Sequence, residues 1–212
     1  MTAYFVRTPF QPAFELEDAM RLAKEMDAPL KILDVDILSD CVVRENPKNR
    51  CYFCKKRIFS AILAQAEKDG IPLIIDGTNA SDDASDRPGM VALQEMQVRS
   101  PLRECGITKE EIRRLSREAG LFVWDKPAYA CLATRIPAGM PITRELLAKV
   151  ERSEIFLAGL GFSDFRVRIL ENGAKLELRK AQLPLLLEHR ETILNELKKE
   201  FATVLLDLEV RQ

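Results

Sequence analysis

The sequence predicts an α/β fold with a parallel sheet, followed by a small α+β domain. Short apolar runs, at 2–6 and 30–38, alternate with longer segments whose apolar residues have helical spacing. Such alternation is typical of parallel strands joined by helices. After "RIPAGMPI" (135–142) the order changes to helix, two strands, helix and strand, which indicates a separate domain. We therefore expect one domain over residues 1–138 and a second over 139–212.

The first domain begins with a predicted strand, "TAYFV" (2–6), and a helix around "EDAMRLAKEMD" (17–27). "LKILDVDIL" (30–38) is apolar along most of its length, so we expect a second, buried strand. A helix should run from about Tyr52 to Asp69, where Gly70 ends it. "IPLIIDGTN" (71–79) predicts a strand that continues into a loop. The next helix spans 109–120, with Thr108 as its N-cap and Gly120 as its stop.

The second domain has a different order of elements. A helix over 143–158 precedes two strands, "FRVRIL" and "AKLEL", which the turn "ENG" (171–173) joins. A long helix over about 181–200 and a last strand, "TVLLDLE", complete the domain. We expect this block to fold as a compact α+β unit.

Composition excludes several classes of protein. The 212 residues carry 32 basic and 33 acidic side chains, a formal net charge of -1, which does not favour general nucleic-acid binding. No apolar run approaches the roughly 18 residues that a membrane span needs. We therefore expect a cytoplasmic protein with reduced thiols. Five cysteines, an odd number, favour ligand or catalytic roles over a disulfide framework.

Glycine-rich phosphate loops do not occur in this sequence. The first glycine is Gly70, and neither G-x-G-x-x-G nor a Walker-type motif is present. Gly159 and Gly161 come nearest, but they precede a strand of the small domain. A self-contained NTPase is therefore not expected, and a fold with no nucleotide site is the alternative.

Cys51 and Cys54 form a C-x-x-C pair in "NRCYFCKKR" (49–57). A thioredoxin-like redox pair is one interpretation, and two buried, inert cysteines are another. Zinc would need two further ligands, but there is no second C-x-x-C and the sequence has one histidine, His189. The basic residues around the thiols would stabilise thiolates and anionic ligands.

Cys131 lies in "WDKPAYACLATRIPAG" (124–139), a segment rich in residue types that perform chemistry. A cysteine pair and a third cysteine from a distant loop fit a three-thiolate [4Fe–4S] site with one iron open to substrate or sulfide. Cys41 and Cys105 have no such surroundings, and the commonest fate of such a cysteine is burial as a small hydrophobic side chain.

Two other patterns indicate binding. Arg166 and Arg168 are two apart on a predicted strand, so they point to one face and could clamp an anion; a solvated strand face is the alternative. The loop 76–79 follows a predicted strand at its carboxyl end, the usual ligand edge of parallel sheets.

Five motifs in this order resemble the LarE family of ATP-dependent sulfur transferases, within the PP-loop ATP pyrophosphatases. They are "NPKNRCYFCKK", "DGTNASDDASDRPG", "RSPLRECGITKEEIRRLSREAGL", "WDKPAYACLATRIPAG" and "FRVRILENGAKLELR". The resemblance covers the chain from about Ala3 to Asp207. It implies a PP-loop (adenine nucleotide alpha hydrolase-like) fold for the first domain.

The resemblance also implies an activity. The family adenylylates a carboxylate with ATP and Mg²⁺ and delivers sulfur to pyridinium-3,5-biscarboxylic acid mononucleotide, a precursor of the nickel-pincer nucleotide. One branch sacrifices a cysteine at the position of Cys131. Another holds a [4Fe–4S] cluster on three cysteines, and Cys51, Cys54 and Cys131 match that pattern.

Further positions match the family one at a time. Arg166 and Arg168 match strand arginines that hold substrate phosphate, and Arg135 matches the arginine of S-R-F-P-Y-G. Glu177 matches a glutamate near the site. The resemblance implies catalytic roles for Cys131, Arg135 and Glu177. It places the nucleotide near a loop made of Asp76, Gly77, Thr78 and Asn79. It also matches Asp86 and Arg87, in "SDRPG", which we expect to bind substrate.

Family members begin with a strand and an S-G-G-x-D-S loop that binds the pyrophosphate of ATP. This sequence starts at what would be the second strand, so we expect a truncated product or a companion chain that supplies the loop. A sheet without its first strand exposes backbone edges, which favours pairing or a homo-oligomer. A non-catalytic subunit and a tRNA-thiolating enzyme are the alternatives, although the near-zero charge speaks against the second.

Overall fold

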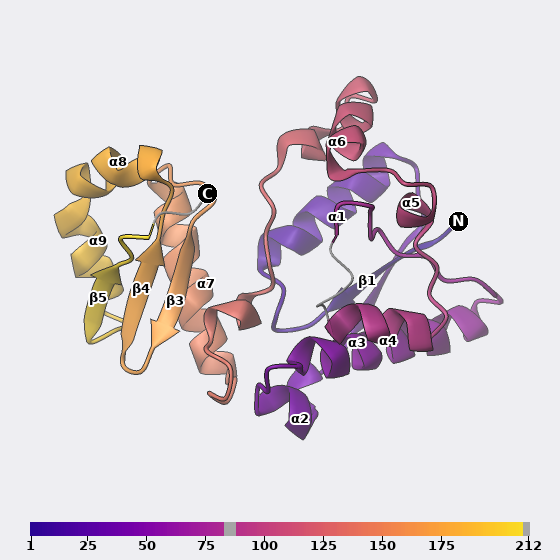
Figure 1. Ribbon diagram of the computed structural model, residues 1–212, viewed down its shortest axis with the longest axis horizontal. Coiled ribbons are helices and arrows are strands. Elements are labelled where there is room, and N and C mark those ends of the chain that lie inside the picture. The colour runs from indigo at the N-terminus through magenta and orange to yellow at the C-terminus, as the bar shows by residue number, and fades with distance from the viewer. Residues whose placement is uncertain (83–87, 210–212) are drawn as a thin grey trace. The chain divides into compact units, whose positions relative to one another are not determined.

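The computed structural model describes residues 1–82 and 88–209. The chain forms two compact units (Figure 1). Unit 1 comprises Met1–Thr8 and Ala13–Lys126, and unit 2 comprises Pro9–Pro12 and Pro127–Gln212. Segment 127–138, which carries Cys131 and Arg135, therefore packs with the C-terminal elements, although the predicted boundary followed it. Within the described residues, no helix is long and apolar enough to cross a membrane.

Unit 1 contains a parallel pair of strands. β1 (Ala3–Arg7) pairs with β2 (Leu30–Asp34), with Ala3 opposite Leu30, and α1 (Ala13–Glu25) connects them. Mixed helix and parallel sheet agree with the predicted α/β class. The prediction that 30–38 is one buried strand is wrong. β2 ends at Asp34 and has no buried residue, because it lies at the edge of a two-stranded sheet.

Segment 71–79 differs from its prediction as well. It forms one isolated parallel bridge, between Ile75 and Arg99, in place of a strand. Asp76 N donates to Arg99 O at 2.9 Å, and Arg99 N donates to Ile74 O at 3.1 Å. A single bridged pair is too short for a ladder, so apolar composition alone did not make a strand here.

Helices cover the rest of unit 1. They are α2 (Cys41–Arg44), α3 (Arg50–Lys68), α4 (Pro88–Glu95), α5 (Pro101–Glu104) and α6 (Lys109–Glu118), with short 3₁₀ turns η1 (Ile37–Ser39) and η2 (Phe122–Asp125). α3 ends before Gly70, whose φ of 68° places it in the left-handed region. The predicted cap of α6 is confirmed, because Thr108 and Glu111 form a reciprocal capping box.

α4 packs along α3 (Figure 1). At Gly89 a Cβ would lie 3.0 Å from Cδ of Lys55, so the absence of a side chain lets the two helices approach closely. This packing sets the first residues of α4 beside the start of α3, where the cysteine pair lies.

Unit 2 is a three-stranded mixed sheet with helices. β3 (Arg166–Leu170) and β4 (Gly173–Glu177) are antiparallel, and β4 and β5 (Thr203–Leu206) are parallel. The helical elements are η3 (Leu132–Arg135), α7 (Arg144–Gly159), η4 (Lys180–Gln182), α8 (Leu183–Glu188) and α9 (Arg190–Leu197). The predicted long helix over 181–200 is thus wrong, because the chain leaves helical geometry at His189, with φ -97° and ψ 11°.

The core of unit 2 forms where α7 and α9 pack and where α7 contacts β3. Leu157, Ile169 and Leu197 are at most 1% exposed, and each comes from a different one of these elements. Burial of such side chains stabilises the unit by about 1.5–3 kcal/mol each. The core therefore fixes α7 relative to β3, and that contact positions the polar groups of the candidate site.

Candidate functional site

The cysteine pair lies at the start of α3. Cys51 is exposed and Cys54 is partly buried, and both belong to the first turns of the helix. Residues three apart are neighbours on a helix surface, so both thiols lie on one side of α3. The helix predicted from about Tyr52 included Cys54, whereas α3 begins at Arg50 and therefore includes Cys51 as well.

A cavity of about 490 Å³ lies beside this pair in unit 1. Its lining includes Cys51 and Lys55 from α3, the loop residues Asp76, Gly77 and Thr78, and the first residues of α4. The structure therefore brings one predicted thiol ligand and three of the predicted cofactor-binding residues to one cavity. Lys55 adds a cation, and Asp82 adds a second carboxylate.

Side chains of the loop itself fix its conformation. The Asp76 carboxylate accepts hydrogen bonds from Thr78 Oγ1 at 2.6 Å and from Ser100 Oγ at 2.6 Å. Asn79 N donates to Asp82 Oδ2 at 3.1 Å. Two Asx turns also hold this loop, in which Thr78 N donates to Asp76 Oδ1 at 3.3 Å and Ser81 N donates to Asn79 Oδ1 at 3.0 Å. The predicted substrate-binding residues Asp86 and Arg87 lie outside the described residues.

None of the five cysteines forms a disulfide, and Cys131 is partly buried. Cys41 and Cys105 are exposed, so their expected burial is wrong; each lies at the end of a short helix, where little packs on it. The described residues contain no close group of three or more His, Cys, Asp or Glu side chains suited to a metal ion. Cys51 and Cys54 belong to unit 1 and Cys131 to unit 2. The three-thiolate site therefore stays a prediction, and its donor chemistry, three reduced thiols, fits an iron–sulfur cluster.

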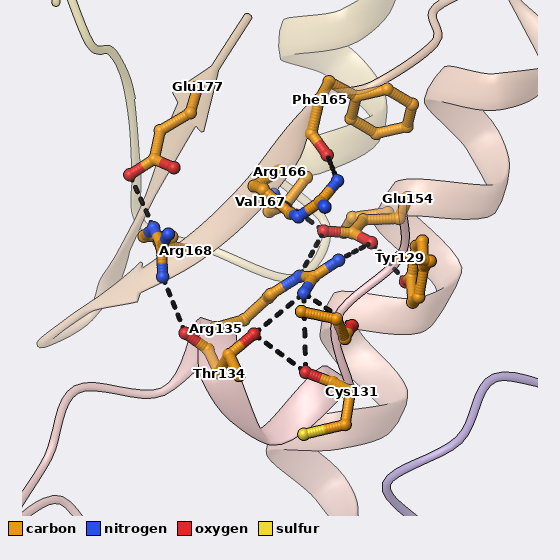
Figure 2. A network of polar contacts seen from close by, with 12 residues as sticks. Tyr129, Cys131, Thr134, Arg135, Glu154, Phe165, Arg166, Val167, Arg168 and Glu177 are labelled. Atoms are coloured by element: carbon orange, nitrogen blue, oxygen red, sulfur yellow. Dashed lines mark hydrogen bonds and ion pairs between the residues drawn. The ribbon is translucent and has the colours of Figure 1, made fainter. Parts of the chain in front are cut away.

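Unit 2 contains a buried polar network (Figure 2). At its centre, Arg135 from η3 forms a bidentate ion pair with Glu154 from α7, with Nε–Oε1 at 2.9 Å and Nη2–Oε2 at 3.0 Å. The side chains are 0% and 5% exposed. Nη1 of Arg135 also donates to Ala130 O at 2.8 Å and Thr134 Oγ1 at 2.8 Å.

Glu154 joins three parts of unit 2. Besides Arg135, its carboxylate accepts the Val167 amide of β3 at 2.9 Å and the hydroxyl of Tyr129. Burial and the neighbouring Glu154 carboxylate raise the pKa of Tyr129 above its usual range, so the hydroxyl remains a donor. One carboxylate thus holds η3, β3 and the segment before Cys131 together.

The thiol of Cys131 points away from this network, whereas its carbonyl faces it (Figure 2). That carbonyl accepts Thr134 Oγ1 at 2.8 Å. The network therefore anchors the backbone on both sides of Cys131 and leaves the sulfur on the opposite side. A fixed backbone is what a reactive or metal-binding thiol needs for defined geometry.

The two predicted clamp arginines lie in different environments. Arg166 is 6% exposed, and its guanidinium donates to Phe165 O at 2.6 Å and Ala128 O at 2.8 Å. The Tyr129 ring lies 4.6 Å from the Arg135 guanidinium and 5.3 Å from that of Arg166. Arg166 thus holds the segment before Cys131 in place.

Arg168 reaches solvent, with 37% of its side chain exposed. Its Nε donates to Glu177 Oε1 at 2.5 Å, and its Nη1 donates to Thr134 O at 2.7 Å. Lys175 lies 3.3 Å from the same Glu177 oxygen. The structure therefore joins two predicted site residues, Arg168 and Glu177, directly to each other and to the end of the Cys131 segment.

Sequence reasoning missed Glu154 and Tyr129. A signal for Glu154 existed, because Leu147, Val150, Glu154 and Leu157 share the helical spacing of the buried face of α7. A glutamate at such a position needs a buried cation as partner. Tyr129 gave no comparable signal, because its role depends on side chains that are distant in sequence.

No family model matches the chain. An uncharacterized protein of Synechocystis is 40% identical over 169 residues, which cover 80% of this chain and 63% of that protein. The pyridinium-3,5-bisthiocarboxylic acid mononucleotide synthase of Lactiplantibacillus plantarum is 33% identical over 195 residues, 92% of this chain and 71% of the synthase. An uncharacterized protein of Methanocaldococcus jannaschii is 31% identical over 207 residues, 97% of this chain and 79% of that protein.

This chain therefore spans between 63% and 79% of the length of these relatives. The match to the Lactiplantibacillus plantarum synthase leaves only 17 of the 212 residues uncovered, so it includes the cysteine pair, the loop at 76–79 and the buried network. The protein belongs to the LarE family, the family of pyridinium-3,5-bisthiocarboxylic acid mononucleotide synthase.

Proposed function

We propose that this protein is an ATP-dependent sulfur transferase that converts an adenylylated carboxylate of pyridinium-3,5-biscarboxylic acid mononucleotide into a thiocarboxylate. The observation that carries this proposal is the 33% identity to the synthase over 92% of the chain. The anchored backbone around Cys131 supports it, because it gives a sulfur-bearing residue a defined position. Unit 1 would be a PP-loop-type domain.

The chemistry needs a good leaving group and a sulfur nucleophile. Adenylylation turns a poor leaving group, oxide, into AMP, so that sulfur can attack the carboxyl carbon and AMP departs. Cys51, Cys54 and Cys131 would hold a [4Fe–4S] cluster, which supplies sulfide when it is bound. The cavity beside Cys51 would bind nucleotide through loop 76–79, with Lys55 facing its phosphates.

The two predicted clamp arginines would take different roles in binding the phosphate of the substrate. Arg168 contributes the direct contact, because its guanidinium reaches solvent, and Glu177 orients it. Arg166 is buried against backbone carbonyls, so it acts chiefly by holding segment 128–131. Arg135 acts in the same way through Ala130, since its side chain is fully buried.

A second candidate function is a non-catalytic or split subunit that needs a companion chain for ATP binding. One observation favours it. Among the described residues that line the cavity, one is a cation, Lys55, and two are carboxylates, Asp76 and Asp82. A triphosphate needs more positive charge or a cradle of backbone N–H groups. A partner that carries such a loop would complete the cavity.

The test is anaerobic purification, followed by incubation with ATP, Mg²⁺ and the dicarboxylate mononucleotide. We expect about four irons per chain, AMP release and a thiocarboxylate product detected by mass spectrometry. Cys51→Ala and Cys131→Ala should lose iron, whereas Cys105→Ala, an exposed cysteine outside the predicted site, should retain it.

Each other outcome has a definite meaning. If product forms without iron and Cys131 loses the mass of H₂S, the sulfur comes from a sacrificed cysteine and not from a cluster. Full iron without AMP release would support the split subunit. Neither iron, nor thiocarboxylate, nor loss of sulfur from Cys131 would contradict sulfur transfer by this chain.

A further inference from the structure

One face of the sheet in unit 2 is open. Leu170 of β3 and Leu205 of β5 are exposed, whereas Ile169, whose side chain points the other way, is buried. Arg168 lies on the open face, because it is two residues from Leu170 on the same strand. Lys175 lies directly opposite Arg168 in the antiparallel pair of β3 and β4. Both cations therefore belong to this face.

A shared carboxylate holds the two cations near each other. Like charges directly opposite in a sheet repel, so the pair needs negative charge nearby. Glu177 follows Lys175 by two residues on β4 and shares its face. One oxygen of Glu177 lies 2.5 Å from Arg168 Nε (Figure 2) and 3.3 Å from Lys175 Nζ. The two nitrogens can therefore be no further apart than the sum of these distances.

Asp207, which directly follows β5, supplies a second carboxylate. Its Oδ2 accepts from Lys175 Nζ at 2.5 Å, and its Oδ1 accepts from the backbone N–H of Glu209 at 3.0 Å. The hydrogen bond between the two side chains raises the pKa of Lys175 and lowers the pKa of Asp207. Both groups are therefore charged at neutral pH, and each carboxylate of this face offsets one cation.

Both cations retain donors for a ligand. Arg168 uses Nε for Glu177 and Nη1 for Thr134 O, and among the described residues nothing accepts from its Nη2. A lysine ammonium has three N–H groups. Lys175 directs one to Asp207 and one toward Glu177. Because its side chain is 29% exposed, the remaining N–H can reach a ligand in solution.

Arg166 does not have this access. It is buried, and its two terminal nitrogens donate to the backbone carbonyls of Phe165 and Ala128. A clamp made of two arginines on one strand would therefore have a single arm in solution. The second accessible cation on this face lies on the neighbouring strand.

We propose that Lys175 is the second arm of the phosphate clamp, so that Arg168 Nη2 and Lys175 Nζ hold the phosphate of the substrate together across β3 and β4. The inference rests on the proposed function for the identity of the substrate, whereas the two cations would hold any phosphate monoester. A phosphate group presents several strong acceptor oxygens, so one phosphate can accept from both arms.

Asp207 should have the opposite effect on the ligand. Its carboxylate competes with phosphate for Lys175 and repels the phosphate charge. Lys175→Met lowers the charge of the face by one, and Asp207→Asn raises it by one. Both changes break the same ion pair, so a purely structural role of that pair would weaken binding in both variants. A clamp predicts effects of opposite sign.

Isothermal titration of the full chain tests this prediction with the dicarboxylate mononucleotide, its dephosphorylated form and inorganic phosphate. Lys175→Met should weaken the mononucleotide about tenfold, the lower end of what a hydrogen bond to a charged group contributes, and leave the dephosphorylated form unchanged. Asp207→Asn should strengthen the mononucleotide and inorganic phosphate roughly threefold, as loss of one nearby unit charge does in water.

Lys149→Met is the matched control. Lys149 lies on α7 of the same unit, is 27% exposed and pairs with Glu145, so its replacement should change none of the affinities. Lys175→Arg keeps a charge and donors, and it should therefore bind the mononucleotide more tightly than Lys175→Met does. Circular dichroism should show that each variant is folded, because every replaced side chain is partly exposed.

Four results would overturn the proposal. They are no phosphate binding by the original protein, unchanged affinity in Lys175→Met, an equal loss for the dephosphorylated form, and weaker binding in Asp207→Asn. Any of them, in a protein that still forms thiocarboxylate, would contradict the clamp and leave the proposed function intact. The expected pattern with inorganic phosphate, in a protein that forms no thiocarboxylate, would support the clamp and contradict only the proposed function.

Discussion

Each unit has a carboxylate with three hydrogen-bond partners, but the two differ in what surrounds them. Glu154 in unit 2 is 5% exposed and joins η3, β3 and the segment before Cys131. Asp69 in unit 1 is 14% exposed and accepts from Lys31, Tyr4 and Gln65. Glu154 lies inside the sheet-and-helix core of unit 2. Asp69 bonds to Tyr4, which lines an open apolar groove of unit 1. Unit 2 therefore satisfies these buried groups within the unit, whereas unit 1 keeps an edge of β1 with which no described strand pairs.

The difference shows how each unit satisfies its polar groups. A buried carboxylate paired with a buried guanidinium must be satisfied within the unit, because water does not reach it. Backbone N–H and C=O groups on an open strand edge are satisfied by hydrogen bonds to water. The closed polar network thus fixes the Cys131 segment, whereas one edge of β1 has no paired strand among those described.

The largest expected effect comes from Glu154→Gln. This change keeps the shape of the side chain but leaves the Arg135 charge buried and uncompensated, so it should lower the free energy of unfolding by about 3–5 kcal/mol. Urea unfolding followed by circular dichroism measures the loss, and amide exchange at Val167 assigns it to unit 2.

The control is Glu145→Gln on the same helix, where the carboxylate is 76% exposed; it should change stability by no more than about 0.5 kcal/mol. Replacing both partners, with Arg135→Met and Glu154→Leu, should restore only part of the loss, because it removes the buried charges but leaves the Val167 N–H and the Tyr129 hydroxyl without their acceptor. Equal effects of the two glutamine variants would show that the network of unit 2 is not a closed, buried one.

Arg168→Ala should have the next largest effect. It removes the one clamp arginine that reaches solvent, so binding of a substrate with a phosphate should weaken by about 1.5–3 kcal/mol, or roughly 10- to 150-fold. Isothermal titration of the mononucleotide and of its dephosphorylated form should show the loss only for the first.

Arg179→Ala is the matched control, since Arg179 is exposed and paired with Asp164 in the same unit. It should bind both forms as the original protein does. An equal loss for both forms of the ligand in Arg168→Ala would indicate that Arg168 supports the fold and does not hold the phosphate.

The smallest effect concerns pH and unit 1. Hydrogen bonds from Lys31 and Tyr4 lower the pKa of Asp69 to about 2, and the bond to Asp69 raises the pKa of Tyr4 to about 12. In the unfolded chain these groups titrate near 3.9 and about 10. The Asp69 contribution is therefore complete above about pH 4 and is lost as pH falls through 2. The Tyr4 contribution is complete below about pH 10 and is lost as pH rises through 12.

Urea midpoints at pH 2–5 and pH 9–12, followed by exchange of β1 amides, measure both changes. In Asp69→Asn the urea midpoint should no longer change with pH in the acid range or in the alkaline range. In Glu118→Gln, which replaces an exposed carboxylate on α6, the midpoint should depend on pH as in the original protein. If the pH dependence is unchanged in Asp69→Asn, the stability of unit 1 does not depend on the bonds of Asp69 to Lys31 and Tyr4. Asp69 would then have no role in unit 1 that corresponds to that of Glu154 in unit 2.

The sequence by itself determined the capped and periodic helices of unit 1 and the α/β class, but not the strand at 71–79 or the break at His189. Helical spacing with a threonine cap gave α6, and an apolar periodic segment ending at a left-handed glycine gave α3 with its two cysteines. Alternation of strands and helices gave the α/β class. These features depend on neighbours within a few residues along the chain, so the local pattern is sufficient to predict them.

Only the tertiary structure decided which groups are buried together. Arg135 and Glu154 are nineteen residues apart, and the packing of η3 on α7 makes one ion pair of them. The same holds for segment 71–77, where an apolar run remains open because no described strand pairs with its free edge. Desolvation and strand pairing depend on what the rest of the chain places beside a residue, and no local pattern contains that information.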